Sequence, residues 1–94
     1  MTIAEKVRLK RDEILKIADQ YGATDVRIFG SVAKGIETPD SDLDVLVDFH
    51  RSLIKLIAFE RELKDLLGCK VDVVTYGGLR PYLKDEILGS AVPL

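Results

Sequence analysis

The feature that most constrains this chain is a glycine–serine pair followed, after ten intervening residues, by an Asp-x-Asp pair. The pair Gly30-Ser31 comes after the apolar segment 26–29, and Asp42 and Asp44 lead into a second apolar segment, 45–47. Both segments have the composition of β-strands. A tight turn between strands can hold a phosphate, and carboxylates beside it can hold a divalent metal. The pattern therefore predicts a small sheet that supports metal-assisted phosphoryl or nucleotidyl transfer.

The turn itself has the residues of an anion site. Gly30 has no Cβ, so the backbone there can approach a ligand closely. Ser31 is predicted to cap a short helix over residues 32–34 that stops at Gly35. Free N–H groups at the start of that helix, with the serine hydroxyl, would bind phosphate. Taken alone, this dipeptide favours an ordinary strand-to-helix turn.

The two aspartates are predicted to share one face of a strand. Side chains two positions apart in a strand point the same way, so Asp42 and Asp44 converge. The residues between and after them, Leu43, Val45 and Val47, then face the core. Two carboxylates on one face repel each other unless a cation lies between them. The pair alone is also consistent with an acidic strand entrance that faces water.

A third carboxylate strengthens the metal hypothesis. Asp72 lies inside the apolar run 71–74, where a charge is costly unless it is paired or bound to metal. If this run forms a strand beside residues 43–47, Asp72 joins the other two carboxylates. The alternative is a half-exposed edge strand. Together, the turn and the three acids predict a metal site formed by Asp42, Asp44 and Asp72.

The remaining patterns predict an α+β fold, a small mixed β-sheet with helices packed on one face. The other face is predicted to be open, because acids that bind metal and substrate need access to solvent. Residues 54, 57, 58 and 66 of the second long helix are expected to point inward. The predicted order is a helix from a capping box at Thr2 and Glu5 to Gly22, strand 25–30, short helix 32–34, strand 43–49, helix 53–67, strand 70–75, and a helix from Pro81 to about Leu88 that ends at Gly89.

Composition limits the class of protein. The 94 residues fit one domain, 1–94, and the net charge of −2 gives no basic field for direct nucleic-acid binding. The single cysteine, Cys69, fits a reducing compartment. No apolar stretch is long enough to span a membrane, and no signal peptide is visible. We therefore expect a cytoplasmic protein without membrane contact.

At this point the motifs can be compared with a known family. The segment 28–31, Gly35 and the segment 40–44 resemble the signature of the DNA polymerase β-type nucleotidyltransferase superfamily. The small size and the segments 70–75 and 91–94 resemble its minimal nucleotidyltransferase (MNT) branch. The resemblance implies a polymerase β-like palm. It also implies an antitoxin to a HEPN-domain ribonuclease toxin, because proteins of this branch are typically encoded beside such toxins. Some of them transfer AMP from ATP to a tyrosine of the toxin.

The resemblance also implies roles for the metal ligands. Asp42 and Asp44 would bind two Mg²⁺ ions, for which Mn²⁺ can substitute. Asp72 would complete the site nearest the attacking hydroxyl.

It implies roles for the turn as well. Gly30, Ser31 and Lys34 would hold the nucleotide phosphates. The branch commonly reads Gly-Ser-Arg-Ala-Arg-Gly, whereas here Val32 and Lys34 replace the two arginines. A lysine offers a point charge in place of a bidentate fork, which predicts weaker triphosphate binding.

The sequence thus predicts a nucleotidyltransferase antitoxin that uses ATP and modifies a tyrosine of a HEPN toxin. Because the chain has no evident second domain to hold an acceptor, we expect a hetero-oligomer with that partner. Two alternatives stay open. The chain could neutralise the toxin by binding alone, or it could transfer a nucleotide to a small molecule.

Overall fold

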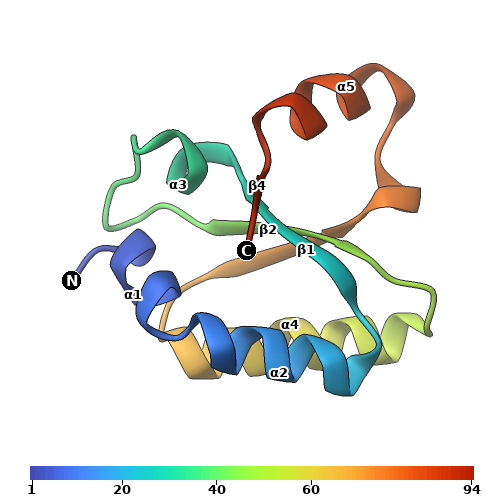
Figure 1. The fold of residues 1–94 in the computed structure, drawn as a ribbon, viewed down its shortest axis with the longest axis horizontal. Helices are drawn as coiled ribbons and strands as arrows, with labels where there is room; N and C mark the ends of the chain where they lie inside the picture. Colours follow the sequence, from blue (N-terminus) through green and yellow to red (C-terminus); the bar gives the residue numbers. More distant parts are fainter.

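The computed structural model describes residues 1–94, and its centre is a four-stranded mixed sheet in the order β3-β2-β1-β4 (Figure 1). Strand β1 (Thr24–Phe29) runs antiparallel to β2 (Leu43–Asp48), and β3 (Val71–Thr75) runs parallel to β2. A short fourth strand, β4 (Val92–Pro93), pairs antiparallel with β1. The predicted α+β class and the three predicted strands are confirmed. Strand β4 was not predicted, because two residues carry no periodic pattern.

The N-terminal region forms two helices where one was predicted. Helices α1 (Ile3–Leu9) and α2 (Arg11–Tyr21) are separated by Lys10, whose φ of −106° and ψ of 17° interrupt the helical path. The capping box at the start of α1 is present, and Gly22 ends α2 in the left-handed conformation. Lys10 is neither a glycine nor a proline, so no residue signalled the break. The break lets the apolar residues of both helices face the sheet.

Helix α4 (Leu53–Leu67) has the predicted bounds but a different inward face. Ile54 and Ile57 were expected to be buried, yet they are 80% and 55% exposed. The segment 53–59 is apolar at every position except Lys55, so spacing alone could not select the inward residues. Ala58 and Leu66 are half-buried. The residues that enter the core are Phe59, Leu63 and Leu67.

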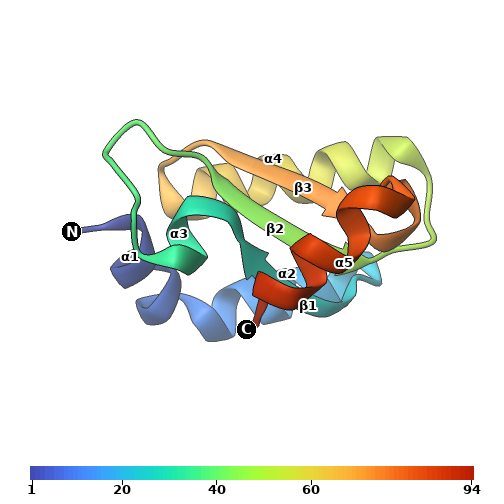
Figure 2. The same ribbon diagram turned by 90° about the horizontal axis from the view of Figure 1, so that it is seen from above.

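The helices divide between the two faces of the sheet. Helices α1, α2 and α4 pack on one face, as predicted, and the main core of buried side chains lies there. Figures 1 and 2 show α3 (Gly30–Lys34) and α5 (Pro81–Ser90) on the other side. Leu46, on β2, is fully buried even though it has the strand parity of Asp44. The face expected to be open is therefore partly covered.

The chain between β3 and β4 completes this cover. A 3₁₀ turn, η1 (Tyr76–Gly78), follows β3, and α5 continues through Gly89, where it was expected to stop. Helix α5 ends at Ser90, and only Ala91 separates it from β4. None of the helices is both long and apolar enough to cross a membrane.

Candidate active site

The register of the sheet brings two of the predicted metal ligands together. Strands β2 and β3 are parallel, and Asp44 is directly paired with Asp72. Asp42 lies immediately before β2, on the face of Asp44. Burial, then the negative charges of Asp72 and Asp42, raise the pKa of the Asp44 carboxyl. The three carboxylates therefore form one electrostatic group.

The side chains of β2 that were predicted to face the core are buried there. Leu43, Val45 and Val47 are at most 1% exposed, whereas Asp44 is half-buried. Asp42 and Asp72 are exposed to solvent. The core residues on either side of Asp44 fix its backbone, while the other two acids keep rotational freedom.

Gly30 places the turn directly against this acidic group. It begins α3 with a φ of +76°, a conformation that favours glycine. A Cβ at this position would collide with Asp44 Oδ2 and lie 3.2 Å from Asp44 Cγ. The missing Cβ thus permits a close approach, and its neighbour in this structure is the carboxylate of Asp44. The backbone turn and the acids form one site.

The role predicted for Ser31 as a helix cap is wrong. Phe29 is the N-cap of α3, and Ser31 lies inside the first turn. Its hydroxyl makes no hydrogen bond to the helix or to any other side chain, so it is available to a ligand. The predicted stop at Gly35 is confirmed, with a φ of +72°.

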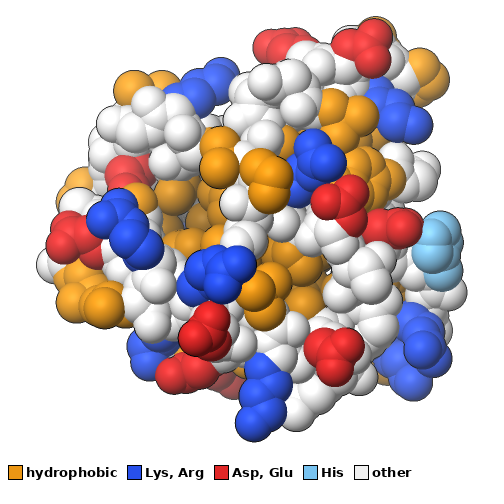
Figure 3. Space-filling model, in the orientation of Figure 1, with side chains coloured by type: hydrophobic (Ala, Val, Ile, Leu, Met, Phe, Trp, Pro, Cys, Tyr) orange, Lys and Arg blue, Asp and Glu red, His pale blue; other side chains and the backbone are white.

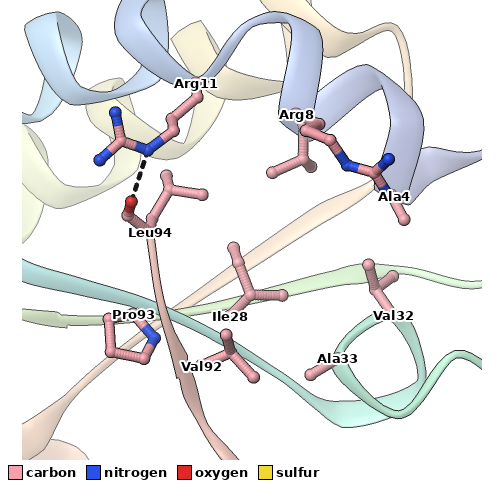
Figure 4. A pocket seen from close by; sticks show the side chains of 10 residues that line it. Ala4, Arg8, Arg11, Ile28, Val32, Ala33, Val92, Pro93 and Leu94 are labelled. Atoms are coloured by element: carbon pink, nitrogen blue, oxygen red, sulfur yellow. Dashed lines mark hydrogen bonds between the residues drawn. The ribbon is translucent and has the colours of Figure 1, made fainter.

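The other two residues of the turn motif have separate environments. Val32 is 7% exposed and packs in the core with Ile28, beside the cavity drawn in Figure 4. A valine in the core offers no hydrogen-bond donor to a phosphate at the turn. Lys34 is exposed and has no ion pair. To contact a ligand beside α3, the Lys34 side chain would have to turn from solvent toward that ligand.

The three carboxylates have the donor chemistry for Mg²⁺ but not a closed arrangement. Carboxylate oxygens are the ligands that Mg²⁺ and Mn²⁺ prefer. Nevertheless, no group of three or more His, Cys, Asp or Glu side chains is positioned to hold a metal ion. The shared charge that raises the pKa of Asp44 is what a bound cation would relieve. The residues fit the ion chemically, and the exposed side chains of Asp42 and Asp72 would have to turn toward it.

A second polar cluster lies at the opposite end of β1 and was not predicted. Asp25 has a φ of +50°, which is rare for a residue other than glycine. Its Oδ2 accepts a hydrogen bond from the Tyr76 hydroxyl at 2.9 Å, and its Oδ1 accepts one from Arg27 Nε at 3.2 Å. These two contacts lower the pKa of the Asp25 carboxyl. The cluster ties η1 to β1, and no sequence signal marked the left-handed residue.

The geometry can now be compared with known proteins. The family model of the nucleotidyltransferase domain matches residues 11–94. The chain belongs to this family. Its range contains the glycine turn and all three carboxylates, and it excludes only residues 1–10, which include α1. The predicted superfamily and the enzyme class, nucleotidyltransferase, are confirmed.

Relatives and solved structures support the narrower branch. A protein of Methanocaldococcus jannaschii, provisionally named a protein adenylyltransferase, is 42% identical over 85% of this chain and 88% of its own length. The protein adenylyltransferase MntA of Thermococcus cleftensis is 35% identical over 82% of this chain and 80% of its own. A provisionally assigned minimal nucleotidyltransferase structure matches with a TM-score of 0.90 and 42% identity, covering 100% of this chain and 97% of that one. The predicted MNT membership is confirmed.

A more distant structure shares the fold alone. It is a toxin–antitoxin complex with AMP-PNP, and it matches with a TM-score of 0.76 and 20% identity, covering 87% of this chain and 69% of that one.

Proposed function

We propose that this chain is an antitoxin that transfers AMP from ATP to a tyrosine hydroxyl of a HEPN-type toxin. The observation that carries the proposal is the pairing of Asp44 with Asp72 beside the Gly30 turn. Acids on adjacent strands with free N–H groups next to them suit a phosphate bridged by metal. The names of the adenylyltransferase relatives support a protein acceptor. The complex with AMP-PNP supports an adenine nucleotide and a toxin partner.

The chain's own residues have separate tasks in this reaction. Asp42, Asp44 and Asp72 would hold two Mg²⁺ ions, which supply positive charge to the α-phosphate, the acceptor hydroxyl and the leaving pyrophosphate. The backbone N–H groups after Gly30 and the Ser31 hydroxyl would donate hydrogen bonds to phosphate oxygens. The acceptor oxygen forms a bond to the α-phosphorus as the bond to the β-phosphate oxygen breaks. Pyrophosphate leaves, and the phenol proton passes to solvent.

The acidity of a phenol supports a tyrosine acceptor. A phenol, with a pKa near 10, loses its proton beside a cation more readily than an aliphatic hydroxyl does. We propose that residues 1–94 act as a single domain and that the partner supplies this tyrosine in a hetero-oligomer. A cytoplasmic location is part of the same proposal, since the lone Cys69 fits a reducing compartment.

The test is the intact mass of a purified HEPN-domain partner, incubated with the chain, ATP and Mg²⁺. Wild type should add one or more AMP masses, and the ribonuclease activity of the partner should fall. Asp44→Asn should add no mass. Asp48→Asn is the matched control, because Asp48 ends the same strand and pairs with His50 at 2.7 Å. Equal transfer by the Asp44→Asn and wild-type chains would refute the catalytic role.

Neutralisation by binding alone is the second candidate. The absence of a ready three-carboxylate metal cluster favours it. It predicts that the double variant Asp42→Asn, Asp44→Asn neutralises the toxin as fully as wild type at equal substoichiometric ratios. Transfer to a small molecule has no supporting observation.

A further inference from the structure

A cavity of about 300 Å³ is lined in part by Val32 and Ala33 of α3. Its walls come from α1, the start of α2, β1, α3 and β4, as Figure 4 shows. In Figure 3, hydrophobic side chains gather in a hollow between α1, α3 and β4. We call it the α1–β4 cavity. Its apolar lining includes Ala4, Ile28, Val32, Ala33 and Val92.

The charged side chains that line this cavity are both basic. Arg8 and Arg11 are the only charged residues that line it. Arg11 donates a hydrogen bond to the Leu94 backbone oxygen at 2.6 Å and pairs with Asp12 at 3.3 Å. Arg8 is exposed and takes part in none of the ion pairs or side-chain hydrogen bonds of the structure. An unpaired guanidinium therefore stands beside an apolar hollow.

The edge strand at this cavity favours recognition by side chains over strand addition. Val92, on β4, is 51% exposed at the cavity wall. The N–H of Leu94 is already bonded to Val26 of β1 at 2.9 Å, and Pro93 has no N–H to offer. A new strand would thus find little to pair with. A partner segment with an apolar side chain next to a carboxylate could fill the hollow with the first and pair with Arg8 through the second.

We propose that the α1–β4 cavity is a docking site for the protein partner, which inserts an apolar side chain and pairs an adjacent acidic residue with Arg8. The identity of that partner rests on the proposed function. The volume is at the lower limit of small-molecule pockets, so it suits one or two side chains better than a cofactor. Arginine beside an apolar pocket is also a common centre of binding energy in protein interfaces.

The position of the cavity explains how docking and chemistry would be linked. The five residues of α3 contribute Val32 and Ala33 to the cavity, and Gly30 and Ser31 to the candidate active site. A partner held at the cavity is one turn of helix from the nucleotide turn. This arrangement keeps the acceptor segment close to the site.

The test measures the affinity of the purified HEPN-domain protein for variants of this chain by calorimetry. Arg8→Glu reverses a charge that has no partner in the free chain, so the fold should be kept. We expect it and Val92→Glu to weaken binding by about tenfold or more. Arg61→Glu is the matched control, an exposed arginine on α4 that does not line the cavity, and it should change affinity by less than about twofold. The affinity for Mg²⁺-ATP should not change in any of these variants.

Three results would overturn the proposal. In the first, the partner binds wild type, Arg8→Glu and Val92→Glu equally, which would refute docking at the cavity and leave the transfer reaction standing. In the second, decanoate raises the melting temperature of wild type but not of Arg8→Glu, while partner affinity is the same in both. The cavity would then be a site for small apolar acids. A wild-type chain that binds no partner but retains Mg²⁺-ATP affinity would refute the partner assignment, and the docking site with it.

Discussion

How closely Gly30 approaches Asp44 can be tested by adding one methyl group and measuring the free energy of unfolding. Gly30→Ala places a Cβ against Asp44 Oδ2 at a φ of +76°. Left-handed backbone costs a residue with a Cβ about 1–2 kcal/mol. The contact atom is the end of a side chain that can rotate, and moving it off its rotamer costs about 0.5–1.5 kcal/mol more. We therefore expect a total loss of about 1.5–3.5 kcal/mol in the free energy of unfolding.

Gly35→Ala is the matched control for this substitution. Its φ is +72°, nearly that of Gly30, but no atom lies within 4 Å of the Cβ it would gain. The Gly35→Ala variant should therefore lose only the free energy of backbone strain, about 1–2 kcal/mol. Urea unfolding followed by circular dichroism gives both losses. The difference between them, about 0.5–1.5 kcal/mol, is the energy of the clash with Asp44.

A double-mutant cycle tests the assignment of that difference. In an Asp44→Ala background the carboxylate is absent, so Gly30→Ala should cost no more than Gly35→Ala does. Equal losses for the two glycine variants in the wild-type background would refute the reasoning, because the turn would then not abut the carboxylate.

Three further predictions concern the acids and the turn. Because burial and the neighbouring acids raise the pKa of Asp44, its ionisation opposes folding; this penalty is present above the folded-state pKa and vanishes below the unfolded value of about 3.9. Asp44→Asn should therefore melt higher than wild type in EDTA at pH 7, with no gain at pH 3, and a lower melting temperature at pH 7 would contradict this. Mg²⁺ should raise the melting temperature of wild type but not that of the triple Asn variant at positions 42, 44 and 72, as differential calorimetry can show. Ser31→Ala should lose about 1–3 kcal/mol of transition-state stabilisation while keeping its stability, because its hydroxyl has no partner in the free chain; unchanged kcat/KM would remove it from the site.

Local sequence patterns predicted the elements that one short range of residues determines. Strand β2 followed from alternation, and Gly22 and Gly35 marked helix ends that the structure places there. The pairing of Asp44 with Asp72 was expected if residues 71–74 formed a strand beside β2, and they do. Asp72 itself is exposed on an edge strand, so its charge did not require a partner. These features depend on residue type and spacing alone.

Features that depend on distant contacts could not be predicted in this way. Ile54 and Phe59 belong to the same apolar run, and only packing against the sheet and α2 decides which is buried. The left-handed Asp25 is held by Tyr76, which lies 51 positions later. The α1–β4 cavity requires β4, whose two residues are a strand only because β1 is beside them.

The same reasoning explains why the carboxylates lie close together before any cation binds. Leu43 and Val45 are buried on either side of Asp44, so the core holds its backbone in place whatever the charge does. The register with β3 then brings Asp72 alongside it, and Gly30 permits the turn to close on it. The buried neighbours thus hold Asp44 close to two other carboxylates. Partial burial and their negative charges disfavour its ionised form, which is why its pKa is raised. A cation that removes the repulsion would stabilise the fold and organise the exposed Asp42 at the same time, so Mg²⁺ should stabilise only those variants of this site that still bind it.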